Sequence, residues 1–205
     1  MWIIKLGGSL LGTDELRHWL ALVAQHGDGR VVIVPGGGVF ADTVRAVYQQ
    51  VPMSETCAHA LAVSAMNQLG TLLIDQMPAL VPAHSELEIA ERSWQHRGIV
   101  WMPSKMVMAD GDDIPHSWDV TSDSLALWLA NKLSAQHLLL VKSQRPEPNS
   151  TLAALTKQGL IDPAFSSFSN GSEVKSWVVF KDDYAAFEQG GFQASALKQV
   201  GHLLS

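Results

Sequence analysis

Two glycine turns near the start of the chain have residue types and spacing suited to binding phosphate groups. The first turn, residues 7–9, follows an apolar run at 2–6, and the second, residues 35–38, follows the β-branched run 31–34. Glycine at such a junction permits positive φ and lets backbone N–H groups approach a ligand closely. Helical sequence follows each turn, so the positive end of a helix dipole would add to the attraction for an anion. Two such turns on neighbouring parallel strands would form one cradle with two anion sites.

Lys5 lies two residues before the first turn, inside the apolar run. An ammonium group is costly within a sheet unless it points out of the carboxyl edge at a partner. Since its neighbours are Ile4 and Leu6, a lysine on an edge strand that faces water is the less favoured interpretation. We therefore expect Lys5 to point at the cradle.

Two known glycine motifs were tested against these turns. The P-loop is excluded, because residues 13–14 are Thr-Asp where that motif requires a lysine and a hydroxyl residue. Residues 36–41 match the G-x-G-x-x-A pattern of dinucleotide folds, and Glu55 lies near the distance of the ribose-binding acid. Pro52 and Ser54 indicate a helix boundary there, and this pattern leaves Lys5 without a role. A nicotinamide or flavin binder remains a competing hypothesis.

Helical and strand patterns alternate along the chain. Periodic apolar residues predict helices at 13–25, 39–50, 54–76, 87–94 and after 121–123, whose hydroxyl and acidic residues are expected to cap the last of these. Apolar runs at 98–101, 137–141 and 177–180 are typical of buried strands, and 103–120 is predicted to be irregular. Such alternation predicts an α/β fold with a mainly parallel sheet covered on both faces. Without a linker, residues 1–205 are expected to form a single domain.

Composition limits the classes of function. A chain of 205 residues with 47% hydrophobic and 17% charged residues suits one soluble domain with a full core. The net charge of −6 gives no general attraction to nucleic acid or to an anionic membrane. The lone Cys57 favours a reducing compartment. No leader is evident and no uncharged run is predicted to be long enough to span a bilayer, so we expect a cytoplasmic protein.

The segment 110–123 is rich in special residues. Asp110, Asp112 and Asp113 could gather Mg²⁺, although an acidic surface turn is the commoner meaning of such a cluster. The eight histidines show no ligand spacing, so no metal site in the protein itself is expected. Trp118 could stack on a flat substrate ring or simply pack against its neighbours.

Residues 5–9 (Lys-Leu-Gly-Gly-Ser) and 34–38 (Val-Pro-Gly-Gly-Gly) together resemble the amino acid kinase family, which includes acetylglutamate, uridylate and isopentenyl phosphate kinases. The run Ile-Pro-His-Ser-Trp-Asp-Val-Thr-Ser-Asp-Ser-Leu-Ala at 114–126 is similar to the branch containing the aminomethylfuran phosphate kinase of methanofuran-type cofactor biosynthesis. The resemblance is good over 1–143 and loose beyond. It implies a three-layer αβα sandwich, with an acceptor-binding part at about 1–120 and a nucleotide-binding part at about 121–205.

The resemblance also implies roles for individual residues. Lys5 would hold the transferring phosphoryl group and Asp123 would orient lysines near it, so both are expected to be catalytic. The nucleotide would be bound by Lys5, Gly7, Gly8, Ser9, Lys142 and Ser143. The acceptor would be bound by Gly36, Gly37, Gly38, His116, Trp118 and Thr121. Members commonly carry Asp-x-Asp-Gly where this chain has Lys-Ser-Gln-Arg-Pro at 142–146, which leaves a non-catalytic relative as an alternative.

Together these features imply an ATP-dependent small-molecule kinase, with Mg²⁺ carried mainly by the nucleotide. Phosphoryl transfer needs charge neutralisation and in-line positioning more than a strong base, and an anionic acceptor attacks without losing a proton. The resemblance points to a phosphate monoester such as aminomethylfuran phosphate. The alternatives are a uridylate- or acetylglutamate-type kinase, or a nucleotide- or dinucleotide-binding protein without kinase activity. We expect a homo-oligomer that binds small molecules and neither nucleic acid nor membrane.

Overall fold

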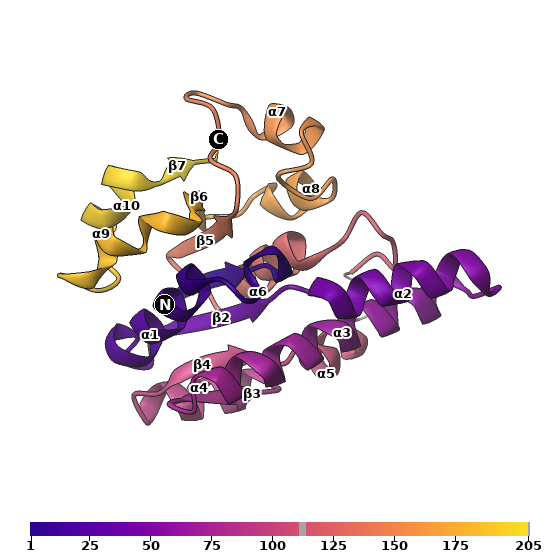
Figure 1. Cartoon of the computed structure of the whole chain (residues 1–205), viewed down its shortest axis with the longest axis horizontal. Coiled ribbons are helices and arrows are strands. Elements are labelled where there is room, and N and C mark those ends of the chain that lie inside the picture. Colours follow the sequence, from indigo (N-terminus) through magenta and orange to yellow (C-terminus); the bar gives the residue numbers. More distant parts are fainter. Residues whose placement is uncertain (111–113, 205) are drawn as a thin grey trace.

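A mostly parallel sheet runs through the molecule (Figure 1). The computed structural model describes residues 1–110 and 114–204, and within these ranges the strands are β1 (Trp2–Leu6), β2 (Val31–Pro35), β3 (Leu80–Ala83), β4 (Gly98–Trp101), β5 (His137–Lys142), β6 (Lys175–Phe180) and β7 (His202–Leu203). Their order is β3-β4-β2-β1-β5-β6-β7, and only β7 is antiparallel to its neighbour among these described strands. The predicted α/β fold is confirmed.

Alternate residues of the central strands pack against different helix layers. Ile3 belongs to the core on the face covered by α6 (Ser122–Lys132), whereas Ile4 belongs to the core on the face covered by α1 (Asp14–His26). Both side chains are fully buried, which explains why β1 is apolar on both faces. Side chains alternate along a strand, so Lys5 points to the same face as Ile3, toward α6.

The helices largely follow the predicted pattern. Besides α1 and α6 the described helices are α2 (Gly38–Gln50), α3 (Glu55–Gln76), α4 (Glu86–Trp94), α5 (Ser104–Ala109), α7 (Leu152–Lys157), α8 (Phe165–Ser169), α9 (Ala185–Glu188) and α10 (Ala194–Val200), with 3₁₀ turns η1 (Gly8–Leu10) and η2 (Lys181–Tyr184). The side chains of Thr13 and Ser54 cap α1 and α3, since each accepts a hydrogen bond from a first-turn N–H. The prediction that 103–120 is irregular is wrong for α5. Asp112 and Asp113 lie outside the described residues.

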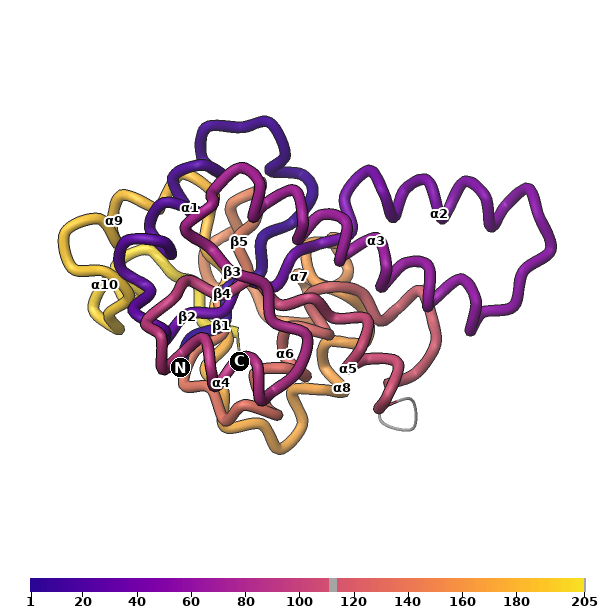
Figure 2. The backbone as a smooth tube through the Cα atoms, turned by 90° about the horizontal axis from the view of Figure 1, so that it is seen from below, coloured from indigo at the N-terminus to yellow at the C-terminus, as the bar shows by residue number. Residues whose placement is uncertain are grey.

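The pair α2 and α3 extends side by side beyond the end of the sheet (Figures 1 and 2). By length and hydropathy α3 could cross a membrane, so the expectation that no uncharged run is long enough is wrong. In this structure 44% of the apolar 18-residue stretch of α3 is buried inside the protein. It packs against α2, α5 and strands β2 to β4. That packing is typical of a core helix.

Candidate active site

The positions of Lys5 and Lys142 follow from strand register and side-chain parity. β1 and β5 pair in parallel, with Lys5 opposite Leu140, so Lys142 lies two residues further along the neighbouring strand, at the carboxyl edge of the sheet. Lys142 has the parity of Leu140, which packs in the core on the α6 face, as Ile3 does. Both ammonium groups therefore point toward the start of α6.

Asp123, in the first turn of α6, lies between these two lysines. Its Oδ1 is 3.1 Å from Lys5 Nζ, and its Oδ2 accepts a hydrogen bond of 2.6 Å from Lys142 Nζ. The side chains are nearly inaccessible, with exposed fractions of 4% for Asp123, 10% for Lys5 and 11% for Lys142. A buried charge is tolerated only when it is paired in this way. We call Lys5, Asp123 and Lys142 the lysine–aspartate triad.

Burial and neighbouring charges both act on the pKa values of the triad. Burial alone would raise the pKa of Asp123, but the two ammonium groups outweigh it and hold that pKa at about 2. Burial and the neighbouring Lys5 lower the pKa of Lys142. With all three groups ionised, two positive charges face one negative charge, so the triad keeps an excess of positive charge for an anion.

An acid from a distant part of the chain caps α6. Thr121 makes no side-chain cap, so the expectation that residues 121–123 cap this helix is wrong. Instead Asp162 Oδ2 accepts hydrogen bonds from Ser124 N at 2.9 Å and Thr121 N at 3.2 Å, and its Oδ1 accepts one from Thr121 Oγ1 at 2.5 Å. Burial and the Asp123 carboxylate raise the pKa of Asp162.

The two glycine turns lie against each other beside the triad. A Cβ on Gly8 would lie 2.0 Å from Gly38 Cα, and a Cβ on Gly36 would lie 3.0 Å from Gly7 Cα. Only glycine allows this approach. Gly38 has a φ of +54°, whereas Gly37 has a φ of −84° and its added Cβ would instead meet Ala41 Cβ at 2.4 Å. Strain from positive φ therefore applies to Gly38 and not to Gly37.

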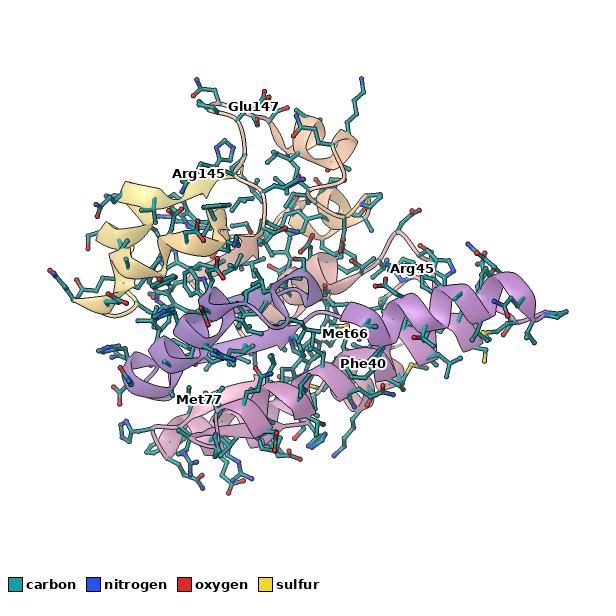
Figure 3. The ribbon with its side chains drawn as sticks, in the orientation of Figure 1. Phe40, Arg45, Met66, Met77, Arg145 and Glu147 are labelled. Atoms are coloured by element: carbon teal, nitrogen blue, oxygen red, sulfur yellow. The ribbon has the colours of Figure 1, made fainter. Side chains whose placement is uncertain are left out.

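A cavity of about 660 Å³ opens over these turns. Lys5 and the glycines line one part of it, and Arg45 of α2, His59 of α3 and Trp118 line another. In Figure 3 the side chain of Arg45 extends from α2 toward the segment before α6. The same figure labels Met66 of α3, which also lines the cavity. A cavity of this size suits a small molecule.

Trp118 is held in the cavity wall by α2. Its ring meets Tyr48 edge to face, with centroids 5.6 Å apart, and the Arg45 guanidinium carbon lies 5.5 Å from the ring centroid. Arg45 also pairs with Asp42 at 2.9 Å. Trp118 thus presents a fixed aromatic surface between charged groups.

His116 does not line the cavity but supports a residue that does. Its ring stacks on His59 with centroids 4.8 Å apart, and its Nδ1 lies 3.3 Å from Thr56 Oγ1. His59 is buried, and burial together with His116 lowers the pKa of His59. The histidine pair joins the segment before α6 to α3.

The structure brings most of the proposed site residues together. The cavity is lined by Lys5, Gly7, Gly8, Ser9, Gly36, Gly37, Gly38, Trp118 and Thr121. Asp123 and Lys142 adjoin it through Lys5, whereas Ser143 is exposed beyond the end of β5. Sequence reasoning missed Arg45, His59 and Asp162. One signal was available for His59, because it falls at helical spacing from Val63 and Met66 on the same face of α3.

The donor set fits phosphate oxygens better than a metal ion. Across residues 1–110 and 114–204, no group of three or more His, Cys, Asp or Glu side chains is placed to hold a metal. Both oxygens of Asp123 already face ammonium groups. Backbone amides at glycine turns and lysines are the ligands that phosphates prefer. The residues present therefore fit a ligand that carries phosphate groups.

The G-x-G-x-x-A match at residues 36–41 does not have the geometry of a dinucleotide-binding fold. Such a fold needs an acidic residue at the end of a second strand. Glu55 is instead the first residue of α3, after the N-cap Ser54, and residues 51–54, all described, connect α2 to α3 without a strand. Glu55 does line the cavity, from the first turn of α3.

Comparison with known proteins agrees with this geometry. Residues 1–145 match the sequence model of the amino acid kinase family. The (5-(aminomethyl)furan-3-yl)methyl phosphate kinase of Methanocaldococcus jannaschii is 31% identical over 142 residues, which is 68% of this chain and 64% of that protein. The match thus spans slightly less than two thirds of that relative.

Two solved structures share the fold. Uridylate kinase from Archaeoglobus fulgidus superimposes with a TM-score of 0.66 at 19% identity, over 100% of this chain and 99% of the other. The isopentenyl phosphate kinase of T. acidophilum gives a TM-score of 0.56 at 14% identity, over 100% of both chains. At such identities the likeness concerns the fold alone.

Proposed function

The chain belongs to the amino acid kinase family, and on that premise we propose that it transfers the γ-phosphoryl group of ATP to a small anionic acceptor. One observation carries the proposal. Two buried ammonium groups, held by one carboxylate, lie at the edge of a cavity whose lining includes two glycine turns in contact. That arrangement neutralises phosphate charge at a fixed place, which is what phosphoryl transfer requires.

Each triad residue has a separate part in the proposed reaction. Lys5 lines the cavity, and its ammonium would contact the phosphoryl group on the acceptor side. Lys142, outside the cavity lining, would contact the same group or its leaving oxygen from the nucleotide side. Asp123 would fix both ammonium groups and touch no phosphate. The Mg²⁺ that accompanies ATP would supply further charge neutralisation on the β- and γ-phosphates.

We further propose that the acceptor is a phosphate monoester. One of its anionic oxygens would attack the γ-phosphorus while the bond to ADP breaks, which gives ADP and a diphosphate. The attacking oxygen already carries the charge, so no general base is needed. Backbone amides of the second turn, residues 36–38, would bind the acceptor phosphate.

The remainder of the cavity favours a planar ring that carries a cationic amine. Trp118 offers an aromatic face, and Glu55 and Asp42 offer carboxylates among the lining residues. These are the features of aminomethylfuran phosphate, named as the substrate of the relative that is 31% identical. The branch assignment depends on this match and on the chemistry of the cavity wall.

A nucleoside monophosphate is the main rival, because it also joins a flat ring to a phosphate. The deciding experiment measures initial rates with aminomethylfuran phosphate, UMP, isopentenyl phosphate and acetylglutamate at one MgATP concentration. We expect the first to react fastest. If UMP or acetylglutamate reacts fastest, the branch is wrong and the kinase assignment stands. If nothing reacts and MgATP gives no thermal shift, the chain is a non-catalytic relative.

A homo-oligomer in the cytoplasm remains part of the proposal. The projecting helices α2 and α3 and their connection expose four apolar side chains, Val39, Val47, Val51 and Leu61, which supports contact with another copy. Light scattering after size-exclusion chromatography measures the molar mass directly. A monomer at micromolar concentration would remove this part of the proposal and leave the kinase assignment unchanged.

A further inference from the structure

We propose that Asp162 is a positioning residue, which holds the first turn of α6 and thereby sets the lysine–aspartate triad. Its kinetic consequences rest on the proposed kinase function. Its structural consequences do not, because they concern only where the two lysines and Asp123 lie.

The start of α6 depends on Asp162 for its hydrogen bonds. The first N–H groups of a helix have no partner within the helix and need an outside acceptor. Thr121, at the N-cap, makes no side-chain cap, and Asp162 accepts from both Thr121 N and Ser124 N. A carboxylate at this end also interacts favourably with the helix dipole. Asp123 lies between the two residues so held, so the direction of its side chain depends on this contact.

The backbone that carries Asp162 is itself fixed against α6. Ile161 and Phe165 flank it, are each 1% exposed, and belong to the core that contains α6. Phe165 N donates a hydrogen bond to Asp162 O at 3.1 Å, and Ala164 N donates one to Asp119 O at 3.2 Å. The Asp162 carboxylate is therefore held in place from both sides.

Asp162 also belongs to the charge balance around Lys142. The charged groups that act on Lys142 are Lys5 from β1, Asp123 from α6 and Asp162 from the segment between α7 and α8. Asp162 favours the protonated form of Lys142. Loss of this negative charge should make Lys142 lose its proton at lower pH, which would move the alkaline limb of the pH–rate profile downward.

The variants separate position from simple loss of stability. Asp162→Asn keeps the shape and leaves one oxygen for the two backbone N–H donors, but it turns an NH₂ group toward Thr121 Oγ1 and removes the negative charge, whereas Asp162→Ala removes every side-chain contact. Asp119→Asn is the matched control, since Asp119 is an exposed acid in the same region and its side chain does not line the cavity. If Asp162→Ala fails to fold, Asp162→Asn still tests the proposal.

The experiment measures kcat, KM and the pH–rate profile of each folded variant, and the acetylation of Lys5 and Lys142 by mass spectrometry. For Asp162→Asn we expect kcat to fall ~10-fold or more, as misplacement of reacting groups does, with KM changed less than ~3-fold. The alkaline limb should move to lower pH, and Lys142 should react faster with acetic anhydride. Asp119→Asn should match the parent in each measurement.

Two results would overturn the proposal. One is a folded Asp162→Asn protein with the kcat, pH limb and lysine reactivity of the parent. The other is a rise in KM with kcat retained, which would indicate a binding role. If the parent transfers no phosphate, the kinase assignment fails, and faster acetylation of Lys142 in Asp162→Asn still decides whether Asp162 acts on Lys142.

Discussion

We expect the ammonium group of Lys5 to be needed for turnover but not for folding. In Lys5→Ala, Asp123 keeps its hydrogen bond to Lys142, so the charge on Asp123 remains paired. We expect kcat to fall at least ~10²-fold, the scale of one lost electrostatic contact in a transition state. The midpoint of thermal denaturation of the variant should stay close to that of the parent. Lys198→Ala, an exposed lysine of α10, is the matched control. Parent-like turnover in a folded Lys5→Ala protein contradicts the role.

Asp123 links the triad to acid stability. Its folded pKa of about 2 lies below the ordinary 3.8, so its contribution is present above pH ~4 and is lost as pH falls from ~4 toward ~2. A depression of this size corresponds to about 2 kcal/mol. The free energy of unfolding, measured in urea between pH 7 and pH 2.5, should fall more steeply at the acid end for the parent than for Asp123→Asn.

The same variant should be less stable than the parent at neutral pH. Asp123→Asn removes the carboxylate that pairs directly with two buried ammonium groups, and breaking a buried pair costs roughly 3–5 kcal/mol. Equal stability of Asp123→Asn and the parent at pH 7 would show that the three groups are not paired as described.

At the scale of elements, Gly38 combines positive φ with close contact between the two glycine turns. Both Gly38 and Gly159 have positive φ, +54° and +70°, but a Cβ on Gly38 would meet Gly8 Cα at 3.2 Å, whereas one on Gly159 would meet nothing within 4 Å. Alanine at either position should cost about 1 kcal/mol or more in backbone strain. Only Gly38→Ala should also weaken acceptor binding, which isothermal calorimetry measures. Equal acceptor affinity in both variants would contradict the cradle.

The histidine pair should make the segment before α6 sensitive to pH. The folded pKa of His59 lies below its ordinary 6.5, so the unfolded chain takes up the proton first and stability falls as pH drops below about 6.5. His59→Gln removes this contribution. The difference in unfolding free energy between parent and variant should therefore change between pH 7 and pH 5. A constant difference over this range contradicts the expectation.

The sequence predicts strands and long helices well because their signals are local. The apolar run of β1 and the parity of Lys5 are sufficient to point its ammonium at one face of the sheet. The cap on α6 could not be predicted, since Asp162 is 41 residues from Thr121 and lies in a turn with no pattern of its own. The short α5 has only six residues, too few for a clear apolar period.

At the scale of the molecule, the lysine–aspartate triad, our proposed reaction centre, depends on two parts of the chain that resemble the family to different degrees. The family model ends at residue 145, after Lys5, Asp123 and Lys142. Asp162, β6 and β7 lie beyond it and complete the sheet edge and the start of α6. The segment beyond residue 145 thus supports residues that lie within the family match. A chain shortened after β5 should therefore lose the arrangement of the lysine–aspartate triad as well as the edge of the sheet.

The most direct measurement is ³¹P NMR of the purified protein incubated with MgATP and aminomethylfuran phosphate. The proposed reaction predicts that ADP and a new diphosphate appear together, with paired phosphorus doublets, and that Lys5→Ala forms neither at a comparable rate. Release of inorganic phosphate alone, or an unchanged spectrum from folded protein that binds MgATP, would contradict phosphoryl transfer to this acceptor.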